Sequence, residues 1–269
     1  MRPILTRSLT QKIEQMEVAV LESRLKAIES IPGNPMEVEI RRFGKAVAFT
    51  IKQIPGPAFN TVRGLHGEDS EKVEAILSYF QDREIPAQFE LIPAFVSHDL
   101  LKLLTERGYR LSKYHRTLYG ACEEASPTYY PGIDIQRLGK NDFHTFAAIY
   151  TKAFQMPGFL TDAVAQNNAV LYDVPGWNFF LASIEQEPAG IGVLVMKDGI
   201  AEMAAAATLP KFRNKGVHQA LIQKRIEHAI FSNCHLLVGQ AADQSVSQFN
   251  MEKAGMGLAY MREIWQKSD

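Results

Sequence analysis

The order of helix-forming and strand-forming segments in the first half of the chain recurs in the second half at a nearly constant offset. Apolar periodicity marks these segments, and glycines mark the ends of their helices. The offset is 146 or 147 residues for the helix starts, the strand starts, the helix-ending glycines and a Tyr-x-Arg triplet, in the pairs Ser70–Gly216, Phe89–His235, Gly108–Gly255 and Tyr114–Tyr260. The agreement of these pairs favours a duplicated α/β unit over two unrelated α/β segments.

Each repeat alternates helices with strands, which predicts a central mixed sheet flanked by helices. The segment 69–80 has apolar residues at i, i+3, i+4 and i+7, with Asp69 or Ser70 as the expected N-cap. Polar residues, two prolines and a glycine fill residues 121–132, ACEEASPTYYPG, as in an interdomain linker. The sequence therefore predicts two domains, residues 1–125 and residues 126–269.

Composition excludes several classes of protein. The 29 Lys and Arg nearly balance the 30 Asp and Glu, so no charge excess indicates a nucleic-acid partner. No apolar run reaches the roughly 18 residues of a membrane span, and no N-terminal stretch reads as a signal peptide. Cys122 and Cys234 are far apart, and the seven histidines form no pair at zinc-ligand spacing. We expect a soluble, cytoplasmic protein without a metal site, and no feature indicates its oligomeric state.

The segment 209–222, LPKFRNKGVHQALI, places cations where a helix begins. The free N–H groups of a helix start carry partial positive charge, so this end of a helix favours an anion. Gly216 lets the backbone approach such an anion, and Arg213 and Lys215 would meet it from the rim. A solvated basic turn is the alternative interpretation of the same residues.

The longer segment 201–222, AEMAAAATLPKFRNKGVHQALI, resembles the acetyl-CoA-binding core of the GNAT N-acetyltransferase superfamily. In that family a strand with small residues precedes Arg/Gln-x-x-Gly-x-Gly/Ala at a helix start. Arg213 and Gly216 match this pattern, and His218 replaces its last Gly or Ala. The order of elements over residues 133–266 and the helix ending in MEKAGM extend the resemblance. The fold it implies is two GNAT-like domains in tandem.

The first repeat carries LHGEDS where the second has the basic loop. Glu68 and Asp69 would repel a diphosphate, so we expect the first domain to be a degenerate GNAT-like domain without cofactor binding. For the second domain, the resemblance implies that backbone groups of a short strand pair with the pantetheine arm and that backbone N–H groups of the loop hold the pyrophosphate. These residues are Ala206, Ala207 and Thr208 on the strand, and Arg213, Asn214, Lys215, Gly216, Val217 and His218 in the loop.

Two helix residues, Ser247 and Asn250, are further candidates for contact with the pantetheine, although both also suit an ordinary helix surface. Glu202 is the candidate base, because some family members carry a glutamate at this position that deprotonates the amine. The family's usual acid is a tyrosine four residues before the helix-ending glycine, and that position is Met251. Three interpretations follow: the thiolate leaves unassisted, another group such as Tyr260 substitutes, or the protein binds acyl-CoA without turnover.

The predicted function is direct transfer of an acetyl group from acetyl-CoA, a co-substrate, to a primary amine. The acceptor is an amine-bearing small molecule or peptide. A non-catalytic acyl-CoA-binding sensor or interaction module is the main alternative, and a purely structural double α/β scaffold is a third. Phe154, Met156 and Phe159 lie where this family often builds its acceptor site, which is an analogy of position only.

Overall fold

The computed structural model describes residues 2–54, 56, 58–123 and 130–268. Half of the predicted linker at 121–132, residues 124–129, lies outside these described residues, and the predicted boundary between residues 125 and 126 falls in this half. The chain divides into two compact units. We call Leu5–Thr117 with the residues from Ala259 onward the N-terminal unit, and the residues up to Ile4 with Leu118–Leu258 the C-terminal unit.

This division differs from the two consecutive domains that the sequence predicts. The last strand, β11 (Gly257–Lys267), pairs antiparallel with β4 (Gln88–Leu91), so most of it belongs to the N-terminal unit. The long strand β5 (Tyr109–Ala121) likewise contributes residues to both units. Strand pairing between residues far apart in sequence sets this division, and periodicity along the chain does not report such pairing.

The N-terminal unit is a mixed sheet with strands in the order β1, β2, β3, β4, β11 and β5. The pairs β1 with β2, β2 with β3 and β4 with β11 are antiparallel, and β3 joins β4 in parallel at Val62 and Phe89. Residues Ala46 and Ala48 of β2 pack with the core under α2 and α3. The other elements are α1 (Arg7–Glu29), β1 (Val38–Phe43), β2 (Ala46–Ile51), β3 (Thr61–Arg63), η1 (Gly67–Lys72), α2 (Val73–Gln81) and α3 (His98–Glu106).

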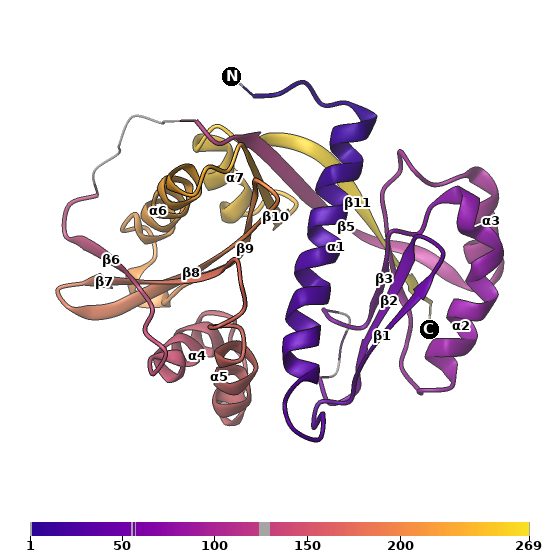
Figure 1. Ribbon diagram of the computed structural model, residues 1–269, viewed down its shortest axis with the longest axis horizontal. Helices are drawn as coiled ribbons and strands as arrows, with labels where there is room; N and C mark the ends of the chain where they lie inside the picture. The colour runs from indigo at the N-terminus through magenta and orange to yellow at the C-terminus, as the bar shows by residue number, and fades with distance from the viewer. Residues whose placement is uncertain (1, 55, 57, 124–129, 269) are drawn as a thin grey trace. The chain divides into compact units, whose positions relative to one another are not determined.

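The C-terminal unit has strands in the order β6, β7, β8, β9, β10 and β5. Alternation along β7 distributes its side chains between two layers of helices: the Phe179 ring contacts Phe143 of α4, and the Phe180 ring contacts His228 of α6. Figure 1 shows α4 and α5 on one side of these strands and α6 and α7 on the other. The elements are β6 (Ile133–Arg137), α4 (Phe143–Ala153), η2 (Gly158–Leu160), α5 (Thr161–Ala169), β7 (Trp177–Ile184), β8 (Glu187–Lys197), β9 (Ile200–Thr208), η3 (Pro210–Phe212), α6 (Val217–Phe231), β10 (Leu236–Ala242) and α7 (Val246–Lys253).

The predicted mixed α/β fold with a repeated order of elements is confirmed. The series β3, α2, β4, α3, β5 of the first repeat returns as β9, α6, β10, α7, β11 in the second. The predicted N-cap at Asp69 or Ser70 is wrong, because η1 begins after His66. Asp69 is instead buried, and its Oδ2 accepts the backbone N–H of Lys45 at 3.2 Å.

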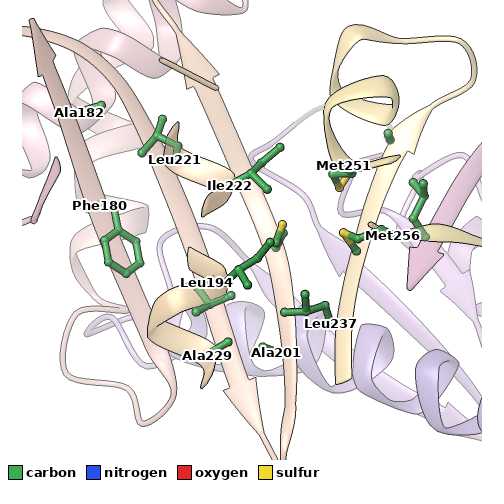
Figure 2. Packing of buried hydrophobic residues seen from close by; sticks show 14 of the residues in the cluster. Phe180, Ala182, Leu194, Ala201, Leu221, Ile222, Ala229, Leu237, Met251 and Met256 are labelled. Carbon is green, nitrogen blue, oxygen red and sulfur yellow. The ribbon is translucent and has the colours of Figure 1, made fainter. Parts of the chain in front are cut away.

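A continuous apolar core fills the space between α6, α7 and the sheet of the C-terminal unit. Figure 2 shows Leu221 and Ile222 of α6 beside the strand residues Leu194 and Leu237, with Met251 and Met256 nearby. Each of these side chains is almost completely buried. The core therefore fixes the start of α6 and the face of α7 against the strands that form the cleft described below. Within the described residues, no helix has the length and apolar character needed to cross a membrane.

Candidate functional site

Strands β9 and β10 separate partway along their length. Their parallel pairing runs from Ile200 and Leu236 to Met203 and Gly239, yet β9 continues to Thr208 and β10 to Ala242. On its other edge β9 stays paired with β8 as far as Thr208. The last five residues of β9 thus present an edge that no described strand completes, and such an edge offers N–H and C=O groups to an extended ligand.

The loop between β9 and α6 has the backbone of an anion-binding turn. Asn214 and Gly216 both adopt left-handed conformations, with φ of 62° and 86°. Gly216 is the N-cap of α6, and the N–H of Ala220 donates to its carbonyl at 2.9 Å. The backbone N–H groups of the preceding turn have no partner within the helix. By contrast, the N–H of Arg213 donates to the carbonyl of Pro210 at 3.2 Å, so that donor is already used.

Glycine is required at position 216 for two reasons. Its φ of 86° is strained for any residue with a Cβ. A Cβ there would also lie 3.2 Å from Cδ1 of Tyr130, closer than an ordinary contact. The ring of Tyr130 thus packs against the loop at the position where α6 begins.

The open edge of β9, the loop and α7 enclose a cleft of about 690 Å³. This volume lies in the range of small-molecule and cofactor sites. All but one of the predicted cofactor-contacting residues line it: Ala206, Ala207, Thr208, Arg213, Asn214, Gly216, Val217, His218, Ser247 and Asn250. Lys215 is not part of the lining, and its Nζ lies 5.4 Å from the centre of the Phe212 ring.

The polar groups of the cleft are positively charged or neutral. Arg213 and Lys253 carry its charges, and no carboxylate lines it within the part of the chain that the structure describes. Nη2 of Arg213 also donates to the carbonyl of Ala153 at 3.0 Å, which ties the loop to the end of α4. Oγ1 of Thr208 is buried and without a hydrogen-bond partner in the described structure. This arrangement suits a ligand that carries both an anion and polar acceptors or donors along its length.

His218 and Asn250 meet within the cleft, where Nδ2 of Asn250 lies 2.9 Å from Nδ1 of His218. Burial, and secondarily the nearby Arg225 guanidinium, lower the pKa of His218 to about 4. The imidazole is therefore neutral near pH 7. Arg225 is fully buried beneath β8 and β9 and donates to the carbonyls of Leu221, Val193 and Ala205; burial lowers its pKa to about 10.

Glu202 lies on β9 one residue before the pairing with β10 ends. It stands opposite Val238 of β10 and Val195 of β8, and only 4% of it is exposed. Nε2 of Gln240 lies 3.5 Å from its Oε1. Glu202 is buried close to the fork between the strands, although it is not among the residues that line the cleft.

Met251 stands at the position of the family's usual general acid, and Tyr260 was the possible substitute for that acid. Neither residue lines the cleft. Met251 is 3% exposed and packs in the core, where its Sδ occupies the space that a Cβ on Gly239 would need. Tyr260 belongs to the N-terminal unit, and its hydroxyl donates to Glu17 of α1. That carboxylate and burial raise the pKa of Tyr260 well above its usual value. The structure therefore gives Tyr260 a partner in a buried polar cluster.

Several residues that line the cleft were not among the predicted cofactor contacts. One is Phe154, which was named from its position in the sequence as part of an acceptor site, and its ring lies 4.7 Å from that of Tyr150. Lys253 follows Asn250 by three residues on α7 and also lines the cleft. Residues three apart in a helix lie on the same face, so the sequence spacing could have predicted Lys253 from Asn250. The remaining ones are Ala153, Phe212, Gln219, Ser245 and Val246. Across the described ranges, no group of three or more metal-ligating side chains could hold a metal ion.

The fork between β9 and β10, the glycine-capped start of α6 and the cleft between them lie in one continuous part of the chain. The sequence profile of the acetyltransferase (GNAT) family matches residues 143–255, which include these three features and every residue that lines the cleft. This part of the chain belongs to the GNAT acetyltransferase family.

Solved structures share the architecture over almost the whole chain. A GCN5-related N-acetyltransferase from Kribbella flavida is 13% identical, with a TM-score of 0.67, over 93% of this chain and 95% of its own. One from Sphaerobacter thermophilus is 16% identical, with a TM-score of 0.62, over 83% and 80%. A tandem GNAT protein from the clavulanic acid biosynthesis pathway is 10% identical, with a TM-score of 0.59, over 100% and 98%. At these identities the likeness establishes the tandem GNAT fold. No curated protein sequence matches the chain.

Proposed function

We propose that this protein is an acetyl-CoA-dependent N-acetyltransferase that transfers the acetyl group directly to a primary amine. The observation that carries the proposal is the cleft, because it joins an open strand edge to an anion-binding helix start. Coenzyme A has the matching parts, an extended pantetheine arm with amide groups and a diphosphate. Its adenosine end would lie toward solvent.

In this arrangement the diphosphate lies against the free N–H groups around Gly216, with Arg213 at the rim. The pantetheine arm extends along Ala206–Thr208 as an added strand. Oγ1 of Thr208 gains a partner when the arm binds, which removes the cost of a buried unpaired hydroxyl. Ser247 and Asn250 contact the arm from the α7 side.

Glu202 is the proposed base. An amine near neutral pH carries an extra proton, and that proton must leave before nitrogen attacks the thioester carbonyl. Glu202 accepts it, directly or through water, from its place next to the fork of β9 and β10. Collapse of the tetrahedral intermediate then breaks the carbon–sulfur bond and releases the thiolate of coenzyme A together with the acetylated amine. The second proton of the amine nitrogen leaves to the thiolate or to solvent.

A second candidate function is binding of acyl-CoA without turnover. One observation favours it: no tyrosine lines the cleft among the described residues, and Met251 fills the position of the family's usual acid. A sensor or interaction module would need only the residues that bind acyl-CoA, and it would need neither a base nor an acid. The acceptor in the enzymatic alternative is an amine-bearing small molecule or peptide.

Two measurements separate these functions. Calorimetry with acetyl-CoA tests binding, and absence of heat from folded protein would refute both. A thiol-release assay against a panel of primary amines tests turnover. The enzyme predicts release that Glu202→Gln reduces about 100-fold or more, as expected for loss of a general base. The matched control is Glu227→Gln, since Glu227 on α6 is exposed, accepts a hydrogen bond from Gln223 and is not part of the cleft lining. Tight binding with no release for any amine supports the sensor.

A further inference from the structure

The pair formed by His218 and Asn250 lies inside the proposed cofactor site, and the function proposed above gives the imidazole of His218 no role. His218 is the second residue of α6, and Asn250 comes from α7. Their 2.9 Å contact therefore joins two walls of the cleft. The only polar atom of the imidazole outside this contact is Nε2.

Burial, and secondarily the Arg225 guanidinium on the same helix, determine the charge of His218. The other charged residues that line the cleft with His218 are Lys253 of α7 and Arg213 of the loop before α6. The β9 residues of the lining, Ala206–Thr208, carry no charge. Arg225 and the charged groups of this lining are thus all cations. This environment opposes protonation of the empty site, which is why the imidazole is neutral there.

An anion at the start of α6 reverses this balance. The N–H groups of the first helical turn, which include the N–H of His218 itself, point to the position where a diphosphate binds. The side chain on that turn lines the same cleft. A diphosphate here brings negative charge next to the ring and compensates the three cations.

We propose that His218 directly contacts the diphosphate of coenzyme A and takes up one proton when the cofactor binds. This inference rests on the proposed function, because it assumes that coenzyme A occupies the cleft. It makes His218 a specificity residue for the doubly charged diphosphate over neutral ligands of similar length.

The side chain of Asn250 can form a hydrogen bond with the imidazole of His218 in both protonation states of that ring. Toward the neutral ring its Nδ2 donates to Nδ1, as the 2.9 Å contact requires. Toward the imidazolium the amide turns over, and its Oδ1 accepts a proton from Nδ1. The pair keeps one hydrogen bond in each state, while Nε2–H is free to donate to a phosphate oxygen. Asn250 therefore positions the ring without fixing its charge.

Proton linkage determines whether the affinity for the cofactor rises or falls with pH. When the complex holds one more proton than the free protein, affinity rises as pH falls, by up to about tenfold per pH unit. This dependence of affinity on pH applies at pH values between the pKa of His218 in the free protein and its higher pKa in the complex. Outside that window both states hold the same number of protons, and affinity does not depend on this group.

Dephospho-coenzyme A is the probe that tests the inference. Coenzyme A carries a 3′-phosphate monoester whose second pKa is about 6, so its own proton would confuse the measurement. Dephospho-coenzyme A keeps the diphosphate and lacks that group. Calorimetry at pH 5.5 in two buffers of different ionisation enthalpy gives the number of protons taken up.

The expected result is uptake of up to one proton by the wild-type protein and almost none by His218→Gln. The matched control is His144→Gln, whose imidazole is 73% exposed on α4 and outside the cleft, and which should keep the wild-type uptake. Nuclear magnetic resonance titration of the His218 imidazole in the wild-type protein, with and without dephospho-coenzyme A, requires no variant and should show a raised pKa in the complex.

Binding without proton uptake, or equal uptake by His218→Gln, would overturn the inference and leave the proposed function intact. No binding of dephospho-coenzyme A or of acetyl-CoA at any pH would overturn both.

Discussion

Nη1 of Arg262 lies 2.8 Å from Oε2 of Glu90, although 172 residues separate them in the sequence. The pairing of β11 with β4 brings them together. Glu17 of α1 completes the cluster by accepting from Arg262, Tyr260 and Thr117. Arg262 and Glu17 are almost completely buried, so this cluster holds the last strand and the first helix to the sheet of the N-terminal unit.

Replacing Arg262 by Met should destabilise the protein by about 3–5 kcal/mol. The substitution keeps much of the side-chain volume but leaves the carboxylates of Glu17 and Glu90 buried without their shared cation. Chemical denaturation followed by circular dichroism measures the loss. Lys140→Met is the control, because Lys140 and Asp173 form an exposed, solvent-screened pair that should contribute little to stability. Equal losses for the two variants would contradict this role of the cluster.

Glu90 should make the stability of the N-terminal unit sensitive to acid. The guanidinium groups of Arg63 and Arg262 outweigh the opposing effect of burial and lower its pKa from 4.5 to about 2. The unfolded chain then binds more protons than the folded one between these values, so stability is lost as pH falls from about 4.5 toward 2. Glu90→Gln should be less stable at pH 7 and should show a shallower decline over that window. Parallel curves for both proteins would disprove the assignment.

Gly216→Ala should lower stability by roughly 1–2 kcal/mol, because alanine is strained in the left-handed conformation. It should also weaken acetyl-CoA binding by about tenfold, since the added Cβ displaces the loop from Tyr130. Thermal unfolding and calorimetry measure the two effects. Gly158→Ala is the matched control, as a Cβ there meets nothing within 4 Å. Wild-type affinity in Gly216→Ala would argue that the loop does not bind the cofactor.

Arg213→Ala should weaken acetyl-CoA binding about tenfold or more, the loss expected when a charge-assisted hydrogen bond is removed. Lys215→Ala should have a smaller effect, because Arg213 lines the cleft and Lys215 does not. Both variants remove one positive charge from the same loop, so they share any long-range electrostatic effect. Titrations at two salt concentrations measure the difference, and an equal loss in both variants would mean that only the net charge of the loop matters.

The sequence alone was sufficient to predict the repeated mixed α/β fold and most of the cleft. Helix starts, helix-ending glycines and apolar periodicity are local signals, and residues 209–222 carry the whole anion-binding turn within one continuous segment. Ser97 illustrates such a local signal, since it directly precedes α3 and its Oγ accepts the backbone N–H of Leu100 as the N-cap of that helix. Lys215 is the exception in the loop, because side-chain direction depends on the turn geometry.

Contacts between distant residues required the tertiary structure. The pairing of β11 with β4 assigns Tyr260 to a buried cluster with Glu17, and no local pattern around Tyr260 reports that partner. The bond between His218 and Asn250 likewise depends on how α6 packs against α7. The sequence thus determined which elements form and which loop carries the glycine-capped start of α6, because neighbouring residues encode both. Only the tertiary structure decided which distant side chains share a site, because packing and strand pairing set those distances.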